Sequence, residues 1–314
     1  MQPPILKKIK SVKIIHNTKL IDYYSWVHQH DILNILSNPK LLNKEVKKYL
    51  TEENIYAKNA LKSTNKLQKV LFNEIKGRIK LADKSVPYID QKYSYWSKTT
   101  EKGNYSIKLR KSIKTGIVEE IWNGDKEFKR LKPSYFGVGD LTVSHDDKLL
   151  AYSLDLKGSE FYDIYLRKLS TKKNLKEVIK ETNGNVLFSY DNKYVIYVKL
   201  DSLHRSKSIF LHKIGTTENS DKKIYEEKIE RFSVSIYPTT DEKYFIISSG
   251  DHSSNKCYFL KSDLKELKPK LFKDFKENIT YSLDSWNGYF YNHTNDNAID
   301  FKIERIKHNN LKKS

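Results

Sequence analysis

The sequence predicts a mainly β protein, an incomplete β-propeller of about five four-stranded blades behind a helical N-terminal lead. Three observations support this fold class. Apolar residues recur at helical spacing up to about residue 80, short runs of Tyr, Val, Ile, Phe and Trp separated by polar turns follow Lys84, and these runs repeat along the chain. Helical spacing indicates amphipathic helices, β-rich runs indicate strands, and a repeat of about 40 to 50 residues is typical of propeller blades.

Residues 1–84 are predicted to form an N-terminal arm and two amphipathic helices. The mixed apolar and basic stretch from Ile5 to Ile21 is interpreted as an extended arm. Asn38-Pro39 marks the expected start of the first helix, and Ser63 or Thr64 is placed as the N-cap of the second. The helical spacing rests on Leu42, Val46, Tyr49, Leu50, Ala57, Ala60 and Leu61 in the first helix and on Leu67, Val70, Leu71, Ile75 and Ile79 in the second.

Residues 85–314 contain five copies of one pattern, in which a β-rich run meets a tight polar turn and a second β-rich run. Lys92, Lys148, Lys193, Lys243 and Gly288 occupy equivalent places, and the spacings between them are 56, 45, 50 and 45 residues. The five turns are Tyr88-Ile89-Asp90-Gln91-Lys92-Tyr93, Ser144-His145-Asp146-Asp147-Lys148-Leu149, Ser189-Tyr190-Asp191-Asn192-Lys193-Tyr194, Thr240-Asp241-Glu242-Lys243-Tyr244 and Asp284-Ser285-Trp286-Asn287-Gly288-Tyr289. The period predicts one propeller blade per copy.

Each of the second and third copies is predicted to contain four strands, which is the number in a propeller blade. The expected strands cover residues 140–143, 149–154, 161–166 and 175–179 in the second copy, and 186–188, 194–198, 208–214 and 223–225 in the third. The fifth copy reaches only its third strand, Ile299–Ile306, before Ser314. Because an open ring leaves a blade face and a strand edge in water, we expect that further chain belongs downstream.

The amino-acid composition is typical of a globular protein and indicates a strongly basic surface. Hydrophobic residues make up 38% of the 314 residues, which suffices for a packed core. The net charge of +19 suits a polyanion partner, but the lysines are spread through every segment, which favours a solvated coat. We expect a cytoplasmic protein with no membrane partner, since neither a signal peptide nor an apolar span of about 20 residues is present. Cys257, the single cysteine, is predicted to be buried and inert in a strand.

Several motifs resemble the prolyl oligopeptidase family of cytosolic serine peptidases, and most closely its oligopeptidase B branch. The most specific stretch runs from Leu71 to Ile79 (LFNEIKGRI) and leads into Asp83-Lys84-Ser85-Val86-Pro87-Tyr88. The other matching motifs are Asp22-Tyr23-Tyr24-Ser25-Trp26, Asn38-Pro39, residues 49–56 (YLTEENIY), Val143-Ser144-His145-Asp146, Leu150-Ala151-Tyr152-Ser153 and residues 211–216 (LHKIGT). The sequence departs from the family at Val27, His28 and Gln29, where the family usually has Leu, Arg and Asp.

The resemblance implies a seven-bladed propeller, of which about five blades are present, that covers the active site of a C-terminal α/β-hydrolase domain and admits only short peptides. Oligopeptidase B cleaves such peptides after Arg or Lys, with a catalytic Ser, Asp and His that all lie in the hydrolase domain. We therefore expect residues 1–314 to be the gating portion of such a peptidase, inactive alone. The expectation includes no catalytic, cofactor-binding or metal-binding residues here, peptide substrates only together with a hydrolase domain, and self-association through the open blade edge.

The residues themselves offer no catalytic motif. The nucleophile elbow of α/β-hydrolases, G-x-S-x-G, does not occur in the sequence. Gly137-Val138-Gly139 precedes an acidic residue and no helix, so it is interpreted as a turn between strands and not as a phosphate loop. His28-Gln29-His30 is not expected to bind a metal, because residues two apart point in opposite directions on a strand and apart on a helix. A catalytic triad assembled from distant residues stays open, since triads are defined by geometry.

A stand-alone basic module that binds nucleic acid or acidic peptides is the alternative function. The run Lys92-Tyr93-Ser94-Tyr95-Trp96-Ser97-Lys98 interleaves aromatic and basic residues, as surfaces that stack single-stranded bases do. The same run fits a blade strand that packs on both faces. Because the strand pattern repeats at the blade period and the lysines do not, we favour the strand and do not expect nucleic acid as a partner.

Overall fold

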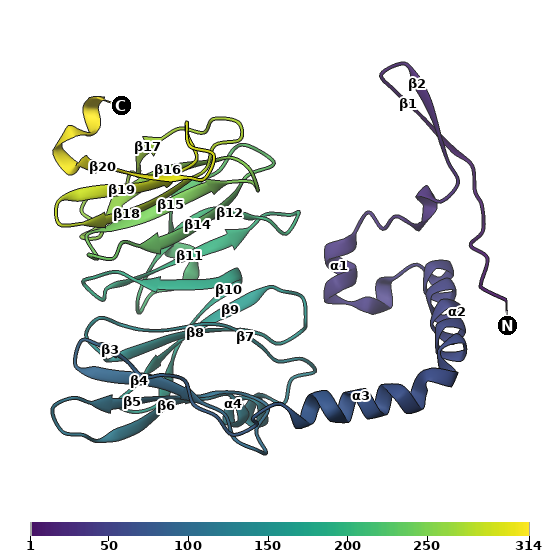
Figure 1. Ribbon diagram of the computed structural model, residues 1–314, viewed down its shortest axis with the longest axis horizontal. Coiled ribbons are helices and arrows are strands. Elements are labelled where there is room, and N and C mark those ends of the chain that lie inside the picture. The colour runs from purple at the N-terminus through teal and green to yellow at the C-terminus, as the bar shows by residue number, and fades with distance from the viewer. Residues whose placement is uncertain (1, 314) are drawn as a thin grey trace. The chain divides into compact units, whose positions relative to one another are not determined.

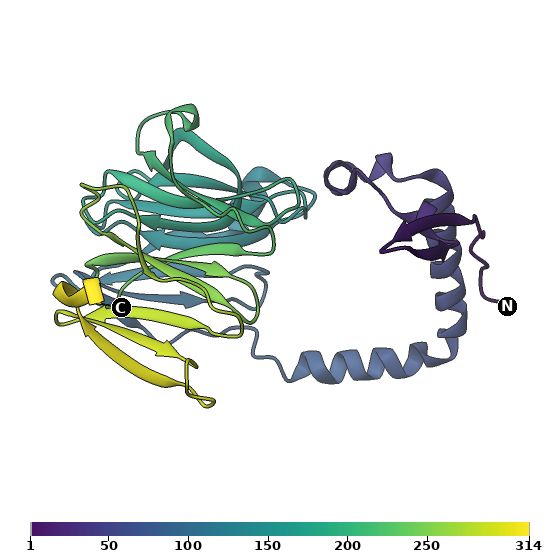
Figure 2. The same ribbon diagram turned by 90° about the horizontal axis from the view of Figure 1, so that it is seen from above.

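The structure is a computed structural model that describes residues 2–313. It divides into two compact units: the first holds the residues up to Asp83 together with Thr99–Lys102, and the second holds Lys84–Lys98 and the residues from Gly103 onward. The first unit is mostly helical, and the second consists mainly of antiparallel sheets (Figures 1 and 2). The predicted mainly β class with a helical lead is confirmed.

The N-terminal unit contains a hairpin, a short helix and two long helices. These elements are β1 (Ser11–Ile15), β2 (Thr18–Asp22), α1 (Ile32–Ser37), α2 (Lys44–Ala60) and α3 (Asn65–Gly77). Both predicted helices are present, but the start predicted at Asn38-Pro39 is wrong. Asn43 caps α2, since its Oδ1 accepts the backbone N–H of Glu45 at 2.9 Å, whereas Asn38-Pro39 opens a separate 3₁₀ turn.

Two segments beside these helices also differ from the prediction. The arm predicted from Ile5 to Ile21 contains the paired hairpin β1–β2, because His16 and Asn17 adopt φ angles of 50° and 59° and form a two-residue turn. Thr64 does precede α3, but its side chain does not cap the backbone of that helix. Its hydroxyl instead donates to the Leu61 carbonyl oxygen at 2.7 Å.

The second unit is built from five successive blades of antiparallel strands, which follow one another in chain order from blue to yellow in Figure 1. Blade 1 has β3 (Tyr88–Asp90), β4 (Tyr93–Lys98), β5 (Ile107–Ser112) and β6 (Val118–Asn123). Blades 2 and 3 share one sheet of β7 (Gly137–Val143), β8 (Leu149–Asp155), β9 (Tyr162–Lys168), β10 (Lys173–Phe188), β11 (Tyr194–Leu200), β12 (Ser206–Lys213) and β13 (Lys222–Glu226). Blade 4 has β14 (Ser233–Pro238), β15 (Tyr244–Gly250), β16 (Asn255–Lys261) and β17 (Lys270–Lys273), and blade 5 has β18 (Tyr281–Trp286), β19 (Tyr289–Thr294) and β20 (Lys302–Lys307).

The predicted strands of the second and third copies are all found, and the three-stranded sheet of the fifth copy ends at β20 as predicted. The predicted incomplete propeller is confirmed. One feature of it was not foreseen: β10 pairs with β9 through its first half and with β11 through its second half, so it serves two blades. Gly184 lies at the change of partner with a φ of 93°, a conformation that favours glycine.

The repeated polar turns share one hydrogen-bonding device. In blade 3 the Ser189 hydroxyl donates to Asp191 Oδ1 at 2.7 Å and accepts the backbone N–H of Tyr194 at 2.9 Å. Asn192, which follows the aspartate, adopts a φ of 59°. The same bonds recur at Ser144 in blade 2 and at Thr239 in blade 4. These turns therefore have a structural role that explains why the pattern repeats.

The hydrophobic core lies in layers between neighbouring blades. The layer between blades 1 and 2 holds Trp122 and Tyr152, 1% and 0% exposed. The remaining layers are centred on Val186 and Tyr197, on Ile196 and Ile247, and on Cys257 and Phe290. Across residues 2–313 no helix is long and apolar enough to cross a membrane.

Candidate functional site

The two histidines that the sequence offered as possible metal ligands lie closer together than predicted. His28 and His30 belong to an irregular segment, and their ring centroids are 4.7 Å apart in an edge-on arrangement. The expectation that they point apart is wrong, because it assumed regular backbone. Within the part of the chain that the structure describes, no three His, Cys, Asp or Glu residues are grouped to hold a metal ion.

The remaining candidate segments lie inside blades. Gly137 and Gly139 belong to β7, so the interpretation as a turn is wrong; a Cβ on Gly139 would lie 2.4 Å from Ser153 Oγ, which requires a glycine in the strand. The run from Lys92 to Lys98 forms the turn residue and strand β4, as favoured. Cys257 is fully buried in β16 as predicted, and burial raises the pKa of its thiol to about 12.

The site that the structure does assemble is centred on helix α4 (Gly124–Leu131), a helix that the sequence analysis does not predict. Asn123 caps it, since its Oδ1 accepts the backbone N–H of Lys126 at 3.1 Å. Asp125 and Glu127 fill the first turn and Lys129 and Arg130 the last, which favours the helix electrostatically. This order of cap, acids and bases was the signal available in the sequence.

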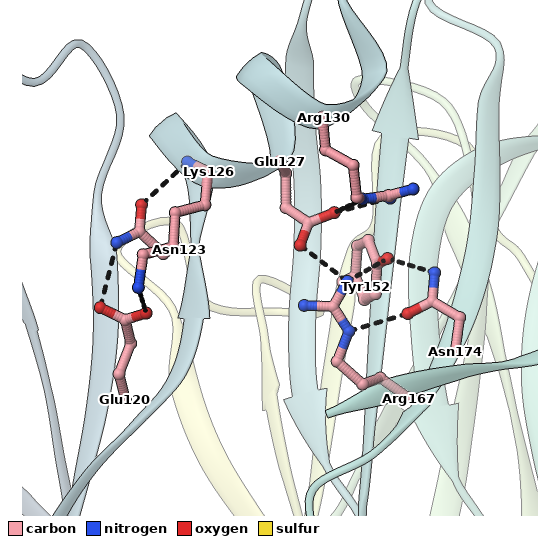
Figure 3. A network of polar contacts seen from close by, with 8 residues as sticks. All are labelled: Glu120, Asn123, Lys126, Glu127, Arg130, Tyr152, Arg167 and Asn174. Carbon is pink, nitrogen blue, oxygen red and sulfur yellow. Dashed lines mark hydrogen bonds and ion pairs between the residues drawn. The ribbon is translucent and has the colours of Figure 1, made fainter. Parts of the chain in front are cut away.

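A buried ion-pair network joins α4 to blade 2 (Figure 3). Glu127, 6% exposed, accepts a hydrogen bond through Oε1 from Arg167 Nη2 at 2.7 Å. Arg167, on β9, also donates to the Tyr152 hydroxyl at 2.9 Å and through Nε to Asn174 Oδ1 at 2.8 Å. Arg130 Nη2 donates to Glu127 Oε2 at 2.7 Å, and this bond raises the pKa of the guanidinium. Each buried charge therefore has an opposite partner, as burial requires.

A second group of polar side chains lies to the left of this network in Figure 3, next to the start of α4. Glu120 accepts hydrogen bonds from Lys126 Nζ at 2.7 Å and from Asn123 Nδ2 at 3.0 Å. Burial by itself raises the pKa of Glu120, but these hydrogen bonds outweigh it and the pKa is lowered. The carboxylate is therefore ionised at neutral pH and holds the start of α4 against β6.

The two groups line one pocket of about 400 Å³ between blades 1 and 2. Its walls come from β6, α4, β9, the turn after β9 and the start of β10, and they include Trp122, Lys172 and Lys173. Apart from Ile121 and Trp122, the side chains that line the pocket are amides or charged groups, and no Ser, Cys or His is among them.

The N-terminal unit carries a different kind of surface. Val46 of α2, 5% exposed, is the one fully buried side chain among those described in this unit. Helix α3 and the residues after it expose a set of large apolar side chains, each between 46% and 62% exposed: Leu67, Val70, Leu71, Phe72, Ile75 and Ile79. Contiguous exposed apolar residues of this kind mark an interaction surface.

Comparison with known proteins identifies what this architecture is similar to. The family description "Prolyl oligopeptidase, N-terminal beta-propeller domain" matches residues 3–314. Among curated proteins, the chain is 29% identical over 261 residues to dipeptidyl aminopeptidase BI of Pseudoxanthomonas mexicana, covering 78% of the chain and 35% of that protein. It is 23% identical over 318 residues to Protease 2 of Moraxella lacunata, covering 99% of the chain and 44% of that protein.

Solved structures share the fold. Oligopeptidase B from Leishmania major superposes with a TM-score of 0.87 at 19% identity, covering 99% of this chain and 45% of that one. Oligopeptidase B from Trypanosoma brucei gives a TM-score of 0.85, also at 19% identity and with the same coverage. The chain thus spans less than half the length of these relatives, and the part that it matches is the N-terminal and propeller part.

Proposed function

Because the chain belongs to the prolyl oligopeptidase family through its N-terminal β-propeller domain, we propose that it is the gating portion of an oligopeptidase B-like serine peptidase. In this proposal a hydrolase domain supplies the catalytic serine, aspartate and histidine and cleaves short peptides after Arg or Lys in the cytoplasm. The blades restrict which peptides reach that domain, and residues 1–314 alone have no activity. The partial match to Protease 2 and the fold shared with oligopeptidase B support this assignment.

The exposed apolar surface of α3 carries the proposal. Phe72 and Ile75 are each 62% exposed on a helix whose own unit has almost no buried core. Covering the exposed part of such a side chain favours a complex by up to about 1–2 kcal/mol, before the costs of association are subtracted. A hydrolase domain that packs on this helix would bury them.

Residues 1–314 are expected to show no hydrolysis of fluorogenic arginyl or lysyl peptides, because the sequence has no nucleophile elbow and no Ser, Cys or His lines the pocket beside α4. A fusion that places residues 3–314 in front of the unmatched remainder of Moraxella Protease 2 is expected to cleave these short peptides and to spare folded proteins. Turnover by the purified chain that a serine-directed inhibitor blocks would contradict the inactivity. A folded, active fusion without preference for Arg or Lys would contradict the substrate class.

The Phe72→Glu substitution is expected to undo the packing of α3 in that fusion, because a carboxylate cannot be buried unpaired. The rate of trypsin cleavage at Lys69 and Lys76 measures whether α3 is covered, because both sites lie on this helix. The fusion should be cut there more slowly than the isolated chain. The Phe72→Glu variant of the fusion should lose this protection. Asn73→Glu is the matched control, since it adds the same charge at the next position. Equal cleavage of the two variants would show that α3 does not dock through Phe72.

A further inference from the structure

The pocket beside α4 contains more positive than negative charge. Five cationic side chains and two carboxylates line it. The carboxylates are already engaged, since Glu120 pairs with Lys126, and Glu127 pairs with Arg167 and Arg130. Lys172 and Lys173 form no ion pair with any residue that the structure describes. The pocket therefore has uncompensated positive charge at its rim.

The floor of the pocket contains a hydrogen-bond donor that is held in place but not used. The Arg167 side chain is 9% exposed, and three neighbours fix its guanidinium through Nε and Nη2. The third nitrogen, Nη1, has no acceptor among residues 2–313. Figure 3 shows this nitrogen directed away from Asn174 and Tyr152, toward the side of Asn123 and Lys126 that lines the same pocket.

We infer that this pocket binds an oxyanion, a phosphate or carboxylate group, through Arg167 Nη1 and the ammonium groups of Lys172 and Lys173. Guanidinium and ammonium groups form strong charge-assisted hydrogen bonds with both kinds of oxyanion. The Glu127, Tyr152 and Asn174 contacts hold the guanidinium rigid, so little side-chain entropy is lost when the anion binds. This site lies within the propeller unit, and the inference does not depend on the proposed peptidase function.

The volume limits the ligand to a small one. About 400 Å³ is near the lower end of the range of roughly 300–1,000 Å³ for small-molecule sites. Two sources of the same chemistry fit this space: a free or small-molecule phosphate, and the acidic side chain of a peptide.

Isothermal titration calorimetry of residues 1–314 at low salt tests the inference with two probes. The probes are inorganic phosphate and acetyl-triglutamate amide, with acetyl-triglutamine amide as the uncharged match of the peptide. We expect saturable binding of at least one anionic probe, weakened by added salt because the rim charges are exposed. Saturation by phosphate identifies the first source and saturation by the glutamate peptide alone the second. Saturation by neither overturns the inference.

A pair of double variants distinguishes the pocket from the general lysine coat. Lys172→Gln/Lys173→Gln removes the rim charges at exposed positions and is expected to weaken binding about tenfold, because two charge-assisted contacts are lost. Lys265→Gln/Lys268→Gln makes the same charge change in the loop between β16 and β17 and is expected to bind as the unaltered chain does. Equal binding by the two double variants overturns the inference. Because the lysines are on the surface, the thermal midpoint of both variants should match that of the unaltered chain.

Discussion

Replacement of Arg167 by methionine is expected to lower the free energy of unfolding by about 3–5 kcal/mol, as is usual when one partner of a buried ion pair is removed. Glu127, 6% exposed, would lose its 2.7 Å hydrogen bond from Nη2 and keep a poorly compensated charge. The Tyr152 hydroxyl, also buried, would lose its bond from the same nitrogen. Urea unfolding followed by fluorescence measures the change, since Trp122 lies in the adjacent core.

Two further variants separate the effect of burial from the effect of charge. Arg130 contacts the same carboxylate, but its side chain is 53% exposed, so Arg130→Met is expected to cost about 1 kcal/mol or less. The double variant Glu127→Leu/Arg167→Met removes both buried charges and is expected to regain much of the stability lost in Arg167→Met. If Arg167→Met and Arg130→Met lower stability equally, the buried pair does not hold α4 to blade 2.

The blades could be predicted from sequence because each one repeats short-range signals. The turn at Ser189 and Asp191 uses bonds between residues no more than five apart, and the same spacing recurs in blades 2 and 4. The strands beside each turn show the β-rich runs that such turns connect. The shared strand β10 was harder to foresee, since its two halves pair with different neighbours without a break in the chain.

Helix α4 was missed although its signals are local. The pair Asn123-Gly124 is also a common turn dipeptide, and the segment lies between two strand-rich repeats, so the sequence is equally compatible with a turn at this position. The residues that α4 contacts in blade 2 could not be predicted from short-range sequence patterns. Glu127 and Arg167 are 40 residues apart, and only the packing of blade 1 on blade 2 brings them together. The apolar face of α3, in contrast, was visible in the helical spacing, but the spacing did not show that the structure leaves it exposed.

A second buried ion pair fixes the junction of blades 3 and 4 in the same manner. Glu227, 2% exposed, follows β13 and lies 3.0 Å from Lys256 Nζ on β16. It also accepts hydrogen bonds from the Ser249 hydroxyl at 2.5 Å, the Tyr225 hydroxyl at 2.8 Å and the Ile229 backbone N–H at 2.7 Å. Burial alone raises the pKa of Glu227, but these bonds outweigh it and lower the pKa to about 2.

This lowered pKa makes the junction sensitive to acid. A carboxylate whose pKa is lower in the folded than in the unfolded chain stabilises the fold above its unfolded pKa, and the stabilisation is lost as the pH falls toward the folded value. For Glu227 that window runs from about 4.5 down to about 2. A lowering of this size corresponds to roughly 3 kcal/mol of stability at neutral pH.

The Glu227→Gln variant is therefore expected to be less stable than the unaltered chain by roughly 3 kcal/mol at pH 7, and by about half of that or less at pH 3. Urea unfolding of both proteins across this pH range measures the difference between their free energies of unfolding. The other carboxylates are the same in both proteins, so their contributions cancel in this difference. Glu226→Gln is the matched control: this neighbour pairs with Lys223 at an exposed position, so its effect should be much smaller. A difference between Glu227→Gln and the unaltered chain that stays constant from pH 7 to pH 3 would show that the charge of Glu227 does not stabilise the junction. In that case the hydrogen bonds that an amide oxygen can also accept would account for its role.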